Sequence, residues 1–259
     1  MPRVAAAWLY PVLFATGVSA GFVDSIAGGG GLITIPILMS LGLAPQDALG
    51  TNKLQATFGS GSAAWHYGQA GLFQWRACRV GILFTGLGSL AGALVVTRLS
   101  PDFLRHVIPW LLVLIALYFL WRPEIGGQDR PARLSDNRFH VLCGLGLGFY
   151  DGFFGPGTGS FWAMAYLLGL GFNLTRATAY TKVMNFTSNL GALAVFLWLG
   201  HVEFAAGLVM GVGQFAGARL GSRAVLKRGA GFIRPFFITV VLLITGKLLC
   251  QNFFQSHAH

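Results

Sequence analysis

The chain contains one unusual segment twice: an aspartate, three further residues and then a glycine-rich break. The first copy is Asp24-Ser-Ile-Ala-Gly-Gly-Gly-Gly31 and the second is Asp151-Gly-Phe-Phe-Gly-Pro-Gly-Thr-Gly159. Glycine weakens a helix through its backbone freedom and proline removes an amide donor, so each copy predicts an interrupted helix. An internal repeat limits the possible folds strongly, because both halves of the chain must follow one plan.

Composition places both copies in a membrane. Hydrophobic residues make up 54% of the 259 residues, charged residues make up 10%, and the mean hydropathy is +0.65. So few polar residues cannot cover a soluble globule of this size. We therefore predict an all-α polytopic membrane protein with about eight transmembrane segments, each of roughly 20 residues. The apolar stretches are residues 8–43, 47–65, 80–97, 106–121, 139–171, 188–200, 204–218 and 236–250.

The repeat divides the chain into two halves. Gly50-Thr-Asn-Lys53 corresponds to Ala179-Tyr-Thr-Lys182, so a lysine follows each break at the same place. We expect residues 1–121 to form a first transmembrane repeat and residues 139–259 a second, with residues 122–138 as a polar linker. Many secondary transporters are built from two such repeats.

Positive charges favour inverted repeats over parallel ones. If each break is the tip of a re-entrant hairpin, the repeats are inverted and sixteen arginines and lysines divide twelve to four between the two sides. If the chain crosses the membrane completely through each break, the repeats are parallel and the same residues divide seven to nine. The positive-inside rule favours the inverted arrangement, with both termini outside the cytoplasm. Residues 12–27 are long for half a crossing, so a glycine-broken full span also stays open.

Other features exclude several classes of function. The net charge of +10 comes from basic residues that border apolar stretches, which is typical of membrane orientation and not of nucleic-acid binding. Cys78, Cys143 and Cys250 lie in or beside apolar stretches without metal-ligand spacing. The chain also lacks a nucleophile motif. We therefore predict no metal, no cofactor and no enzymatic activity, and we expect the lipid bilayer as the surrounding partner.

Four charged residues mark the candidate site. Asp24, Lys53, Asp151 and Lys182 lie in apolar or small-residue segments, where a charge is costly and is by default functional. Broken helices at membrane depth line a cavity or are covered by protein, and their free amides and helix N-termini favour an anion. The candidate substrate-binding residues are Gly28, Gly29, Gly30, Gly31, Asn52, Lys53, Gln55, Gly155, Gly157, Thr158, Gly159, Thr181, Lys182 and Asn185.

The charged groups leave alternatives open. Asp24 and Asp151 either neutralise the two lysines in internal salt bridges or act as protonatable gates that couple transport to protons, with His66 as a proton relay. In a competing hypothesis the two aspartates bind Na⁺ or H⁺ and glycine carbonyls complete the shell. The lysines argue against this cation path, because a positive charge beside it repels the ion. A structural alternative is that the glycines only allow close helix packing.

The residues around the first break resemble the signature of a known family. Gly21-Phe-Val-Asp-Ser-Ile-Ala-Gly-Gly-Gly-Gly-Leu-Ile-Thr-Ile-Pro36, followed by Ala48-Leu-Gly-Thr-Asn-Lys53 and Trp65-His-Tyr67, is similar to the TauE/SafE sulfite exporter family over essentially the whole chain. The resemblance implies a multi-pass protein of the bacterial inner membrane that moves sulfite, sulfonates or related small sulfur-containing anions, usually outward. The second copy departs from the signature at Gly155-Pro-Gly-Thr-Gly159, which is typical of two copies that serve one asymmetric site.

Physical pattern and resemblance agree on a negatively charged substrate. We predict a secondary transporter that exports a small anion by alternating access, with the anion held near mid-membrane by the two breaks and by Lys53 or Lys182. The identity of the anion, the coupling ion and the oligomeric state stay open.

Overall fold

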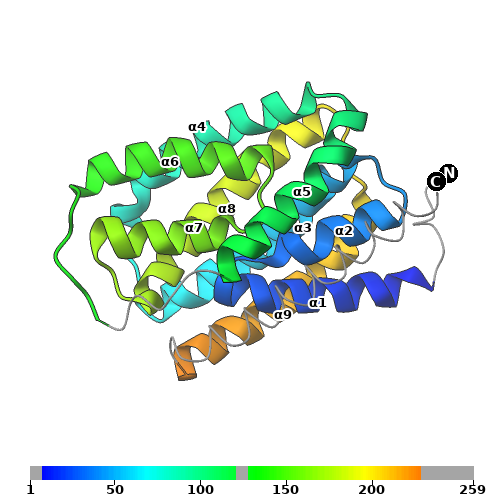
Figure 1. Cartoon of the computed structure of the whole chain (residues 1–259). Coiled ribbons are helices and arrows are strands. Elements are labelled where there is room, and N and C mark those ends of the chain that lie inside the picture. Colours follow the sequence, from blue (N-terminus) through cyan, green and yellow to red (C-terminus); the bar gives the residue numbers. More distant parts are fainter. Residues whose placement is uncertain (1–7, 121–127, 229–259) are drawn as a thin grey trace.

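The structure is a computed structural model that describes residues 8–120 and 128–228, and every regular element within them is a helix (Figure 1). The elements are α1 (Leu9–Ala27), α2 (Gly30–Ser40), α3 (Pro45–Gln69), α4 (Trp75–Thr97), α5 (Pro101–Leu120), α6 (Asp136–Phe153), α7 (Thr158–Ala165), a π-helical turn (Tyr166–Leu170), α8 (Leu174–Trp198) and α9 (Phe204–Arg228). The all-α prediction is confirmed for this part of the chain. The apolar stretch 236–250 and residues 122–127 of the predicted linker lie outside the described residues.

Each glycine break separates a long helix from a shorter one that turns back beside it. Gly28, which follows α1, has a φ of +76°, and Gly157, which precedes α7, has a φ of +81°. This left-handed region favours glycine, so these two residues fix where the helices stop and start. The first residue of α2 lies beside α1, because a Cβ at Gly30 would be 3.0 Å from the carbonyl oxygen of Ala20. We describe α1–α2 and α6–α7 as two helical hairpins (Figure 1).

The first helix of each half packs mainly against a helix of the other half. α1 packs most extensively against α9, and α6 packs in the same way against α4. The central helices α3 and α8 contact each other and lie between these two pairs (Figure 1). In the view of Figure 1, α1 begins on the right of the bundle and α6 begins on the left, so these corresponding helices run in opposite directions.

Glycines bring these packed helices into backbone contact. A Cβ at Gly21 of α1 would collide with the backbone of Gln214 in α9. In the other pair, a Cβ at Gly152 of α6 would collide with the backbone of Ser89 in α4. Small residues at helix interfaces allow such close approach in membranes, where burial of apolar surface does not drive helices together.

The bundle is apolar outside and polar within. The side chains of Lys53 and Lys182 are only 1% exposed, and that of Gln55 is fully buried. A water-soluble domain rarely shows this combination of buried charge and a broad apolar surface, which is the arrangement that lipid favours. Large apolar side chains exposed on the surface include Phe14, Leu83, Leu87, Trp110, Leu142, Leu197, Leu208 and Val212.

Two described helices meet a length and hydropathy criterion for crossing a membrane: α1 over Leu9–Ile26 and α4 over Trp75–Thr97. The central helices α3 and α8 are not among them, and both carry buried polar residues such as Asn52 and Asn185. The finding is consistent with a membrane protein, while the number of about eight spans stays a prediction.

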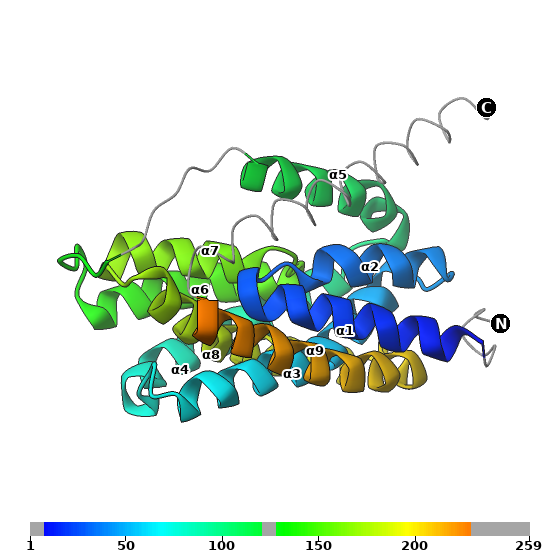
Figure 2. The same ribbon diagram turned by 90° about the horizontal axis from the view of Figure 1, so that it is seen from below.

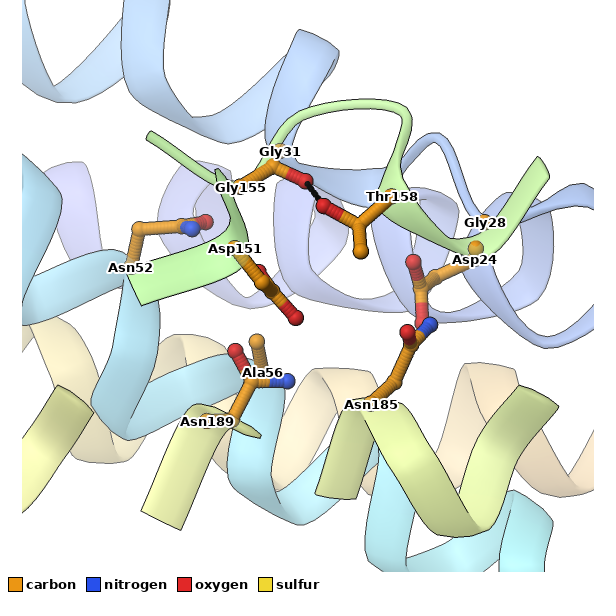
Figure 3. A pocket seen from close by; sticks show the side chains of 11 residues that line it. Asp24, Gly28, Gly31, Asn52, Ala56, Asp151, Gly155, Thr158, Asn185 and Asn189 are labelled. Carbon is orange, nitrogen blue, oxygen red and sulfur yellow. Dashed lines mark hydrogen bonds between the residues drawn. The ribbon is translucent and has the colours of Figure 1, made fainter. Parts of the chain in front are cut away.

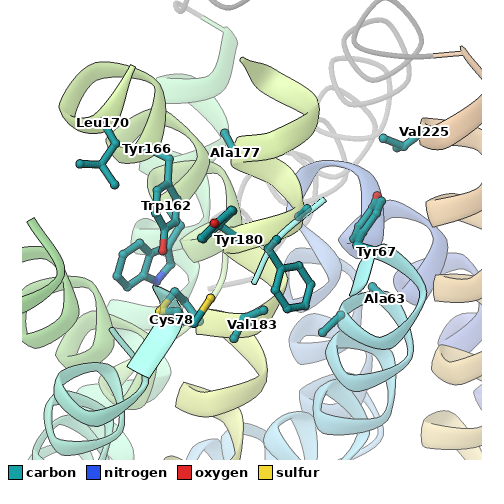
Figure 4. Close-up of a cluster of buried hydrophobic side chains, with 14 of the residues drawn as sticks. Ala63, Tyr67, Cys78, Trp162, Tyr166, Leu170, Ala177, Tyr180, Val183 and Val225 are labelled. Atoms are coloured by element: carbon teal, nitrogen blue, oxygen red, sulfur yellow. The ribbon is translucent and has the colours of Figure 1, made fainter. Parts of the chain in front are cut away.

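Two apolar clusters flank the polar centre of the bundle. An aromatic cluster contains Tyr67, Trp162, Tyr166 and Tyr180 (Figure 4). A mainly aliphatic cluster includes Leu32, Ile35, Leu49, Leu104, Ile108, Ala192 and Phe196. α3 runs from the aliphatic cluster to the aromatic one, and α8 runs from the aromatic cluster to the aliphatic one. The polar residues of both central helices lie between the clusters.

α5 lies on the outside of the bundle, beyond α2 and α7 (Figure 2). Its residues Leu104 and Ile108 join the aliphatic cluster together with Leu32 and Ile35 of α2. α5 therefore covers the first hairpin on one side of the central helices.

Candidate functional site

The two glycine breaks meet in the middle of the bundle. A Cβ at Gly28 would collide with the Cα of Gly159, and a Cβ at Gly159 would collide with the Cα of Gly28. Beside them, a Cβ at Gly31 would lie 3.2 Å from Cγ of Pro156. The hairpin tips touch backbone to backbone, which only residues without a side chain permit. The N-termini of α2 and α7 therefore converge at this point.

A polar cavity lies beside the meeting point of the hairpin tips. It contains about 310 Å³ of empty space, including space that is open to solvent. The carboxylates of Asp24 and Asp151 and the amides of Asn185 and Asn189 point into it (Figure 3). The lining residues are Asp24, Gly28, Gly31, Asn52, Ala56, Asp151, Gly155, Thr158, Gly159, Asn185 and Asn189.

The first ion pair joins Lys53 of α3 to Asp151 of α6. Lys53 Nζ lies 2.7 Å from Asp151 Oδ1 and also donates to the backbone oxygen of Asp151. The hydroxyl of Ser188 donates to the second carboxylate oxygen, Oδ2. The side chains of Lys53 and Asp151 are 1% and 5% exposed. Both carboxylate oxygens therefore have a donor, and the pair is shielded from water.

The second ion pair joins Lys182 of α8 to Asp24 of α1. Lys182 Nζ lies 3.5 Å from Asp24 Oδ2 and also donates to the backbone oxygen of Asp24. The other carboxylate oxygen accepts the amide N–H of Gly30 over 3.3 Å. The side chain of Asp24 is 16% exposed, although that of Lys182 is 1% exposed. This pair repeats the first one with longer contacts and a more accessible carboxylate.

Each lysine therefore binds the aspartate of the other half of the chain. The internal salt bridge, one of the two roles that the sequence left open for the aspartates, is present in both pairs. The two carboxylates line the cavity, whereas the two ammonium groups lie behind them and are not among the lining groups that the described residues provide. When all four groups are charged, the constellation is neutral, as buried charges require.

A chain of hydrogen bonds leads from the cavity wall to α9. Asn52 Oδ1 accepts the hydroxyl of Thr34 over 2.6 Å and the amide of Gln55 over 3.0 Å. The amide of Gln214 in turn donates to Gln55 Oε1 over 3.3 Å. These bonds fix the orientation of Asn52 at the cavity wall, because its acceptor oxygen is held from two sides.

Two polar atoms on α8 are buried without a hydrogen-bond partner in the described part of the chain, namely Asn185 Oδ1 and Thr181 Oγ1. The residues are four positions apart and so share one face of the helix. A buried polar atom without a partner costs about 1–3 kcal/mol. Asn185 lines the cavity, so its free acceptor is available to a bound group.

Most of the predicted binding residues come together at the cavity. A second group lies directly behind the lining, because Lys53, Lys182 and Gln55 contact lining residues through the bonds described above. Thr181 is buried on α8 but does not line the cavity. The backbone of the two breaks is completed by Gly29, Gly30 and Gly157. The predicted residues that line the cavity are Asp24, Gly28, Gly31, Asn52, Asp151, Gly155, Thr158, Gly159 and Asn185.

His66 lies apart from the cavity. It belongs to the last turn of α3, which is about 20 Å along the helix from Lys53 at 1.5 Å per residue. Its role as a proton relay stays a prediction, since the bonds described around the cavity do not lead to it. Within residues 8–120 and 128–228, no three His, Cys, Asp or Glu side chains gather as metal ligands would.

The predicted binding set omits several residues of the site. Ser188 binds the Asp151 carboxylate, and Asn189 lines the cavity. Both lie near the face of α8 that carries Lys182 and Asn185, so helical spacing is a signal that identifies them. Thr34 and Gln214 come from other helices, and only the tertiary fold brings them to Asn52 and Gln55.

Comparison with known proteins gives consistent matches over nearly the whole chain. The family model described as "Sulfite exporter TauE/SafE" matches residues 13–248. The chain is 47% identical over 251 residues to "Probable membrane transporter protein YfcA" of Escherichia coli strain K12, which covers 97% of this chain and 93% of that protein. It is 44% identical over 243 residues to "Probable membrane transporter protein ORF9" of a Sinorhizobium species, covering 94% and 93% of the two chains. No solved structure shows a significant match.

Proposed function

Because this chain belongs to the TauE/SafE sulfite exporter family and is a membrane transporter, we propose that it carries sulfite or a related small sulfur-containing or organosulfonate anion outward across the bacterial inner membrane. The transport is secondary and proceeds by alternating access. The chain has no enzymatic activity in this proposal, and it works as a multi-pass protein within the lipid bilayer.

The observation that carries this proposal is the convergence of two broken helices on one polar cavity inside the bundle. The N-termini of α2 and α7 meet where Gly28 touches Gly159. Helix N-termini present amide groups and positive dipole ends, which favour an anion. A sulfonate group has three oxygen acceptors, and Asn52, Asn185 and Thr158 supply polar groups around the same space. Lys53 and Lys182 supply positive charge directly behind it.

Alternating access fits the way in which the halves are joined. Corresponding helices run in opposite directions, and the first helix of each half packs against a helix of the other half: α1 against α9, and α6 against α4. The cavity lies between an aromatic cluster and a mainly aliphatic cluster along α3 and α8. Opening one cluster while the other stays closed would expose the cavity to one side at a time, as in transporters built from inverted repeats.

We also propose an inverted-repeat topology with eight membrane segments, in which residues 1–121 and 139–259 are the two repeats and residues 122–138 are the linker. The hairpins α1–α2 and α6–α7 each enter the membrane and return to the side from which they came. Three full crossings follow each hairpin, namely α3, α4 and α5 in the first repeat and α8, α9 and the apolar stretch 236–250 in the second. The hairpin shape of α1–α2 supports this arrangement over a complete crossing through the break.

Cysteine labelling in whole cells tests the topology. In a cysteine-free background, a cysteine at Ala132 of the linker should be protected from a membrane-impermeant maleimide. A cysteine at Gly200, between α8 and α9, should react, because the two positions face opposite sides in the inverted arrangement. Reaction at Ala132 with protection at Gly200 would reverse the orientation, and equal reaction at both would contradict the arrangement itself.

A second function has one specific observation in its favour. Asp24 and Asp151 line the cavity directly, whereas the lysines lie behind them, so a cation would meet carboxylates first. On that hypothesis the protein is a Na⁺ or H⁺ channel or transporter. A reversal potential in planar bilayers that follows the cation gradient, and ignores the anion gradient, would support it.

Uptake of radiolabelled sulfite into proteoliposomes tests the anion proposal. The wild-type protein should accumulate sulfite, and competition by thiosulfate, sulfoacetate and taurine should rank the substrates. Lys182→Ala and Asn185→Ala should each reduce uptake at least tenfold, whereas Gly146→Ala on the open face of α6 should not change it, because a Cβ there meets no atom within 4 Å. Full uptake by both site variants would disprove the assignment of the cavity as the binding site.

A further inference from the structure

The two ion pairs differ in how firmly each carboxylate is held. Asp151 receives Lys53 at 2.7 Å on one oxygen and the Ser188 hydroxyl on the other. The Asp24 carboxylate receives only longer contacts, with Lys182 at 3.5 Å and the Gly30 amide at 3.3 Å. Asp24 is also the more exposed of the two carboxylates, at 16% against 5%. Of the two carboxylates in the cavity, Asp24 is therefore the more accessible to water and the one that loses less by changing partner.

The difference has a cause in the sequence. Ser188 follows Lys182 by six residues, and the residue six positions after Lys53 is Gly59. The first half therefore has no hydroxyl at the position whose counterpart in the second half holds Asp151. The space beside Gly59 is filled instead by the end of the Gln214 side chain, since a Cβ at Gly59 would collide with Gln214 Oε1.

The Asn185 amide group faces Asp24 across the cavity. Figure 3 draws its amide nitrogen on the side of the Asp24 carboxylate and its oxygen Oδ1 on the other side. Asn185 Oδ1 is buried and has no hydrogen-bond partner among the residues that the structure describes. The amide nitrogen can donate to a charged carboxylate, and a turn of the amide would let Oδ1 accept the O–H of a protonated one, so Asn185 can serve Asp24 in both states.

We infer that Asp24 is the carboxylate that takes up a proton when the anion binds, and that it thereby releases Lys182 to hold the anion, while Asp151 stays paired with Lys53. This inference rests on the proposed function and deepens it, because it names the coupling group and the lysine that binds the substrate.

The charges balance in this exchange. A proton from water in the cavity adds to an Asp24 carboxylate oxygen, and the ion pair between Lys182 and Asp24 is broken. Lys182 keeps its ammonium proton and pairs with the incoming anion, so a neutral constellation is restored when that anion carries one negative charge. One proton and one monovalent anion therefore bind together and leave together. Export then follows the concentration gradient of the anion and carries a proton in the same direction.

Few other titratable groups of the described residues face Asp24. Lys182 approaches it from α8, and Tyr67 of α3 donates to the backbone oxygen of the adjacent Ser25 over 3.1 Å. Asp151 of α6 shares the cavity with it. α2 and α7 contain no titratable side chain. α9 meets α1 at this level through Gly221, where a Cβ would collide with Ser25 Oγ, and Arg219 and Arg223 of α9 are exposed. The proton is therefore assigned to Asp24 and not to a neighbouring base.

The test measures anion binding and proton uptake on the full-length protein in detergent. The probe is methanesulfonate, a monovalent anion that does not titrate in the range used, so every proton taken up is bound by the protein. For the wild type, the affinity should fall by up to about tenfold per pH unit once Asp24 is charged, since one proton is linked to binding. An indicator dye in weakly buffered solution should report about one proton per anion bound.

The variants separate Asp24 from the rest of the protein. Asp24→Asn should bind methanesulfonate with an affinity independent of pH and without proton uptake, and Asp24→Glu should restore both signals. The matched control Asp102→Asn, on an exposed residue at the start of α5, should keep the wild-type pH dependence. If Asp24→Asn does not fold, the double variant Asp24→Asn with Lys182→Met removes both charges and should bind at least tenfold more weakly at every pH.

Each outcome decides between the two proposals. Wild-type binding without proton uptake would overturn the coupling by Asp24 and leave the anion transporter standing. The same holds if Asp24→Asn keeps the pH dependence, or if Asp151→Asn folds and loses the proton instead. A wild-type protein that binds neither methanesulfonate nor sulfite would overturn the proposed function and this inference with it.

Discussion

Lys53 and Lys182 occupy the same position in the two halves of the chain, yet the carboxylates that they bind are in different surroundings. Both carboxylates line the cavity, but they are held and exposed differently. In the Lys53–Asp151 pair, which we call the closed pair, the contact is 2.7 Å and the carboxylate is 5% exposed. In the Lys182–Asp24 pair, which we call the open pair, the contact is 3.5 Å and the carboxylate is 16% exposed. The internal repeat therefore gives two equivalent ion pairs, each of which joins one half of the chain to the other. Local sequence differences, such as Gly59 in the first half where the second half has Ser188, then give the two ion pairs different properties.

The largest expected effect comes from breaking the closed pair. Lys53→Met leaves the Asp151 carboxylate buried without its countercharge, which should cost about 3–5 kcal/mol. Lys182→Met should cost less, because Asp24 can reach water through the cavity. Thermal unfolding of the purified proteins, followed by size-exclusion fluorescence, measures both losses.

A double variant controls this comparison. Lys53→Met combined with Asp151→Leu removes both charges of the closed pair and should recover most of the stability that Lys53→Met loses. Equal destabilisation by Lys53→Met and Lys182→Met would contradict the distinction between a closed pair and an open pair.

The next effect concerns the contact between the hairpin tips. Gly159→Ala places a methyl group against the backbone of Gly28 and should cost about 1–3 kcal/mol through overpacking. Gly28→Ala adds the penalty of a left-handed backbone at φ +76°, about 1–2 kcal/mol more. Both variants should also lose sulfite uptake in proteoliposomes, because the helix N-termini no longer converge.

Gly146→Ala is the matched control for the hairpin tips. It lies within α6, where an added Cβ meets no atom within 4 Å, so its stability should be unchanged or higher by up to about 1 kcal/mol. If Gly28→Ala and Gly159→Ala behave like this control, the two tips do not form a tight contact in the working protein.

The sequence predicts the broken helices and the charged residues, but not which charges pair. Asp24 is nearer in the chain to Lys53 than to Lys182, yet it binds Lys182. This pairing arises because α1 packs against α9 of the second half and α6 packs against α4 of the first half. These contacts join helices that are far apart in the sequence, so no local pattern predicts them. His66 lies away from the cavity for a simpler reason, because the helical rise places it about 20 Å from Lys53. Its role as a proton relay stays a prediction.

Hydropathy predicts the outer helices better than the central ones. α1 and α4 are apolar enough to be identified as spans, whereas α3 and α8 carry the polar residues of the site on their buried faces. The polar residues of the site thus lower the mean hydropathy of α3 and α8, and this is why a hydropathy criterion does not identify these two helices as spans. The lysines and asparagines within these segments are what identify them as functional.

A smaller effect should follow from loosening the closed pair without breaking it. Ser188→Ala removes the hydroxyl that donates to Asp151 Oδ2 but leaves Lys53 in place. The loss of one hydrogen bond to a charged acceptor should cost about 1–3 kcal/mol, at the low end if water enters from the cavity. Thr187→Ala on the same helix is the control, since the Thr187 hydroxyl donates to the backbone oxygen of Val183 in its own helix. Equal unfolding temperatures for the two variants would show that Ser188 does not hold Asp151.

The smallest and most specific effect should come from adding to the open pair a hydroxyl donor like the one that Ser188 provides in the closed pair. Gly59→Ser places a hydroxyl at the position equivalent to Ser188, and a donor to Asp24 favours its charged form. Anion binding should then require more acid, so the pH at which affinity declines should move down. Gly59→Ala displaces the end of Gln214 in the same way but brings no hydroxyl, so it should leave that pH unchanged. A shift that is the same for serine and alanine would come from Gln214 and not from Asp24, and the hydroxyl would then not explain why the two pairs differ.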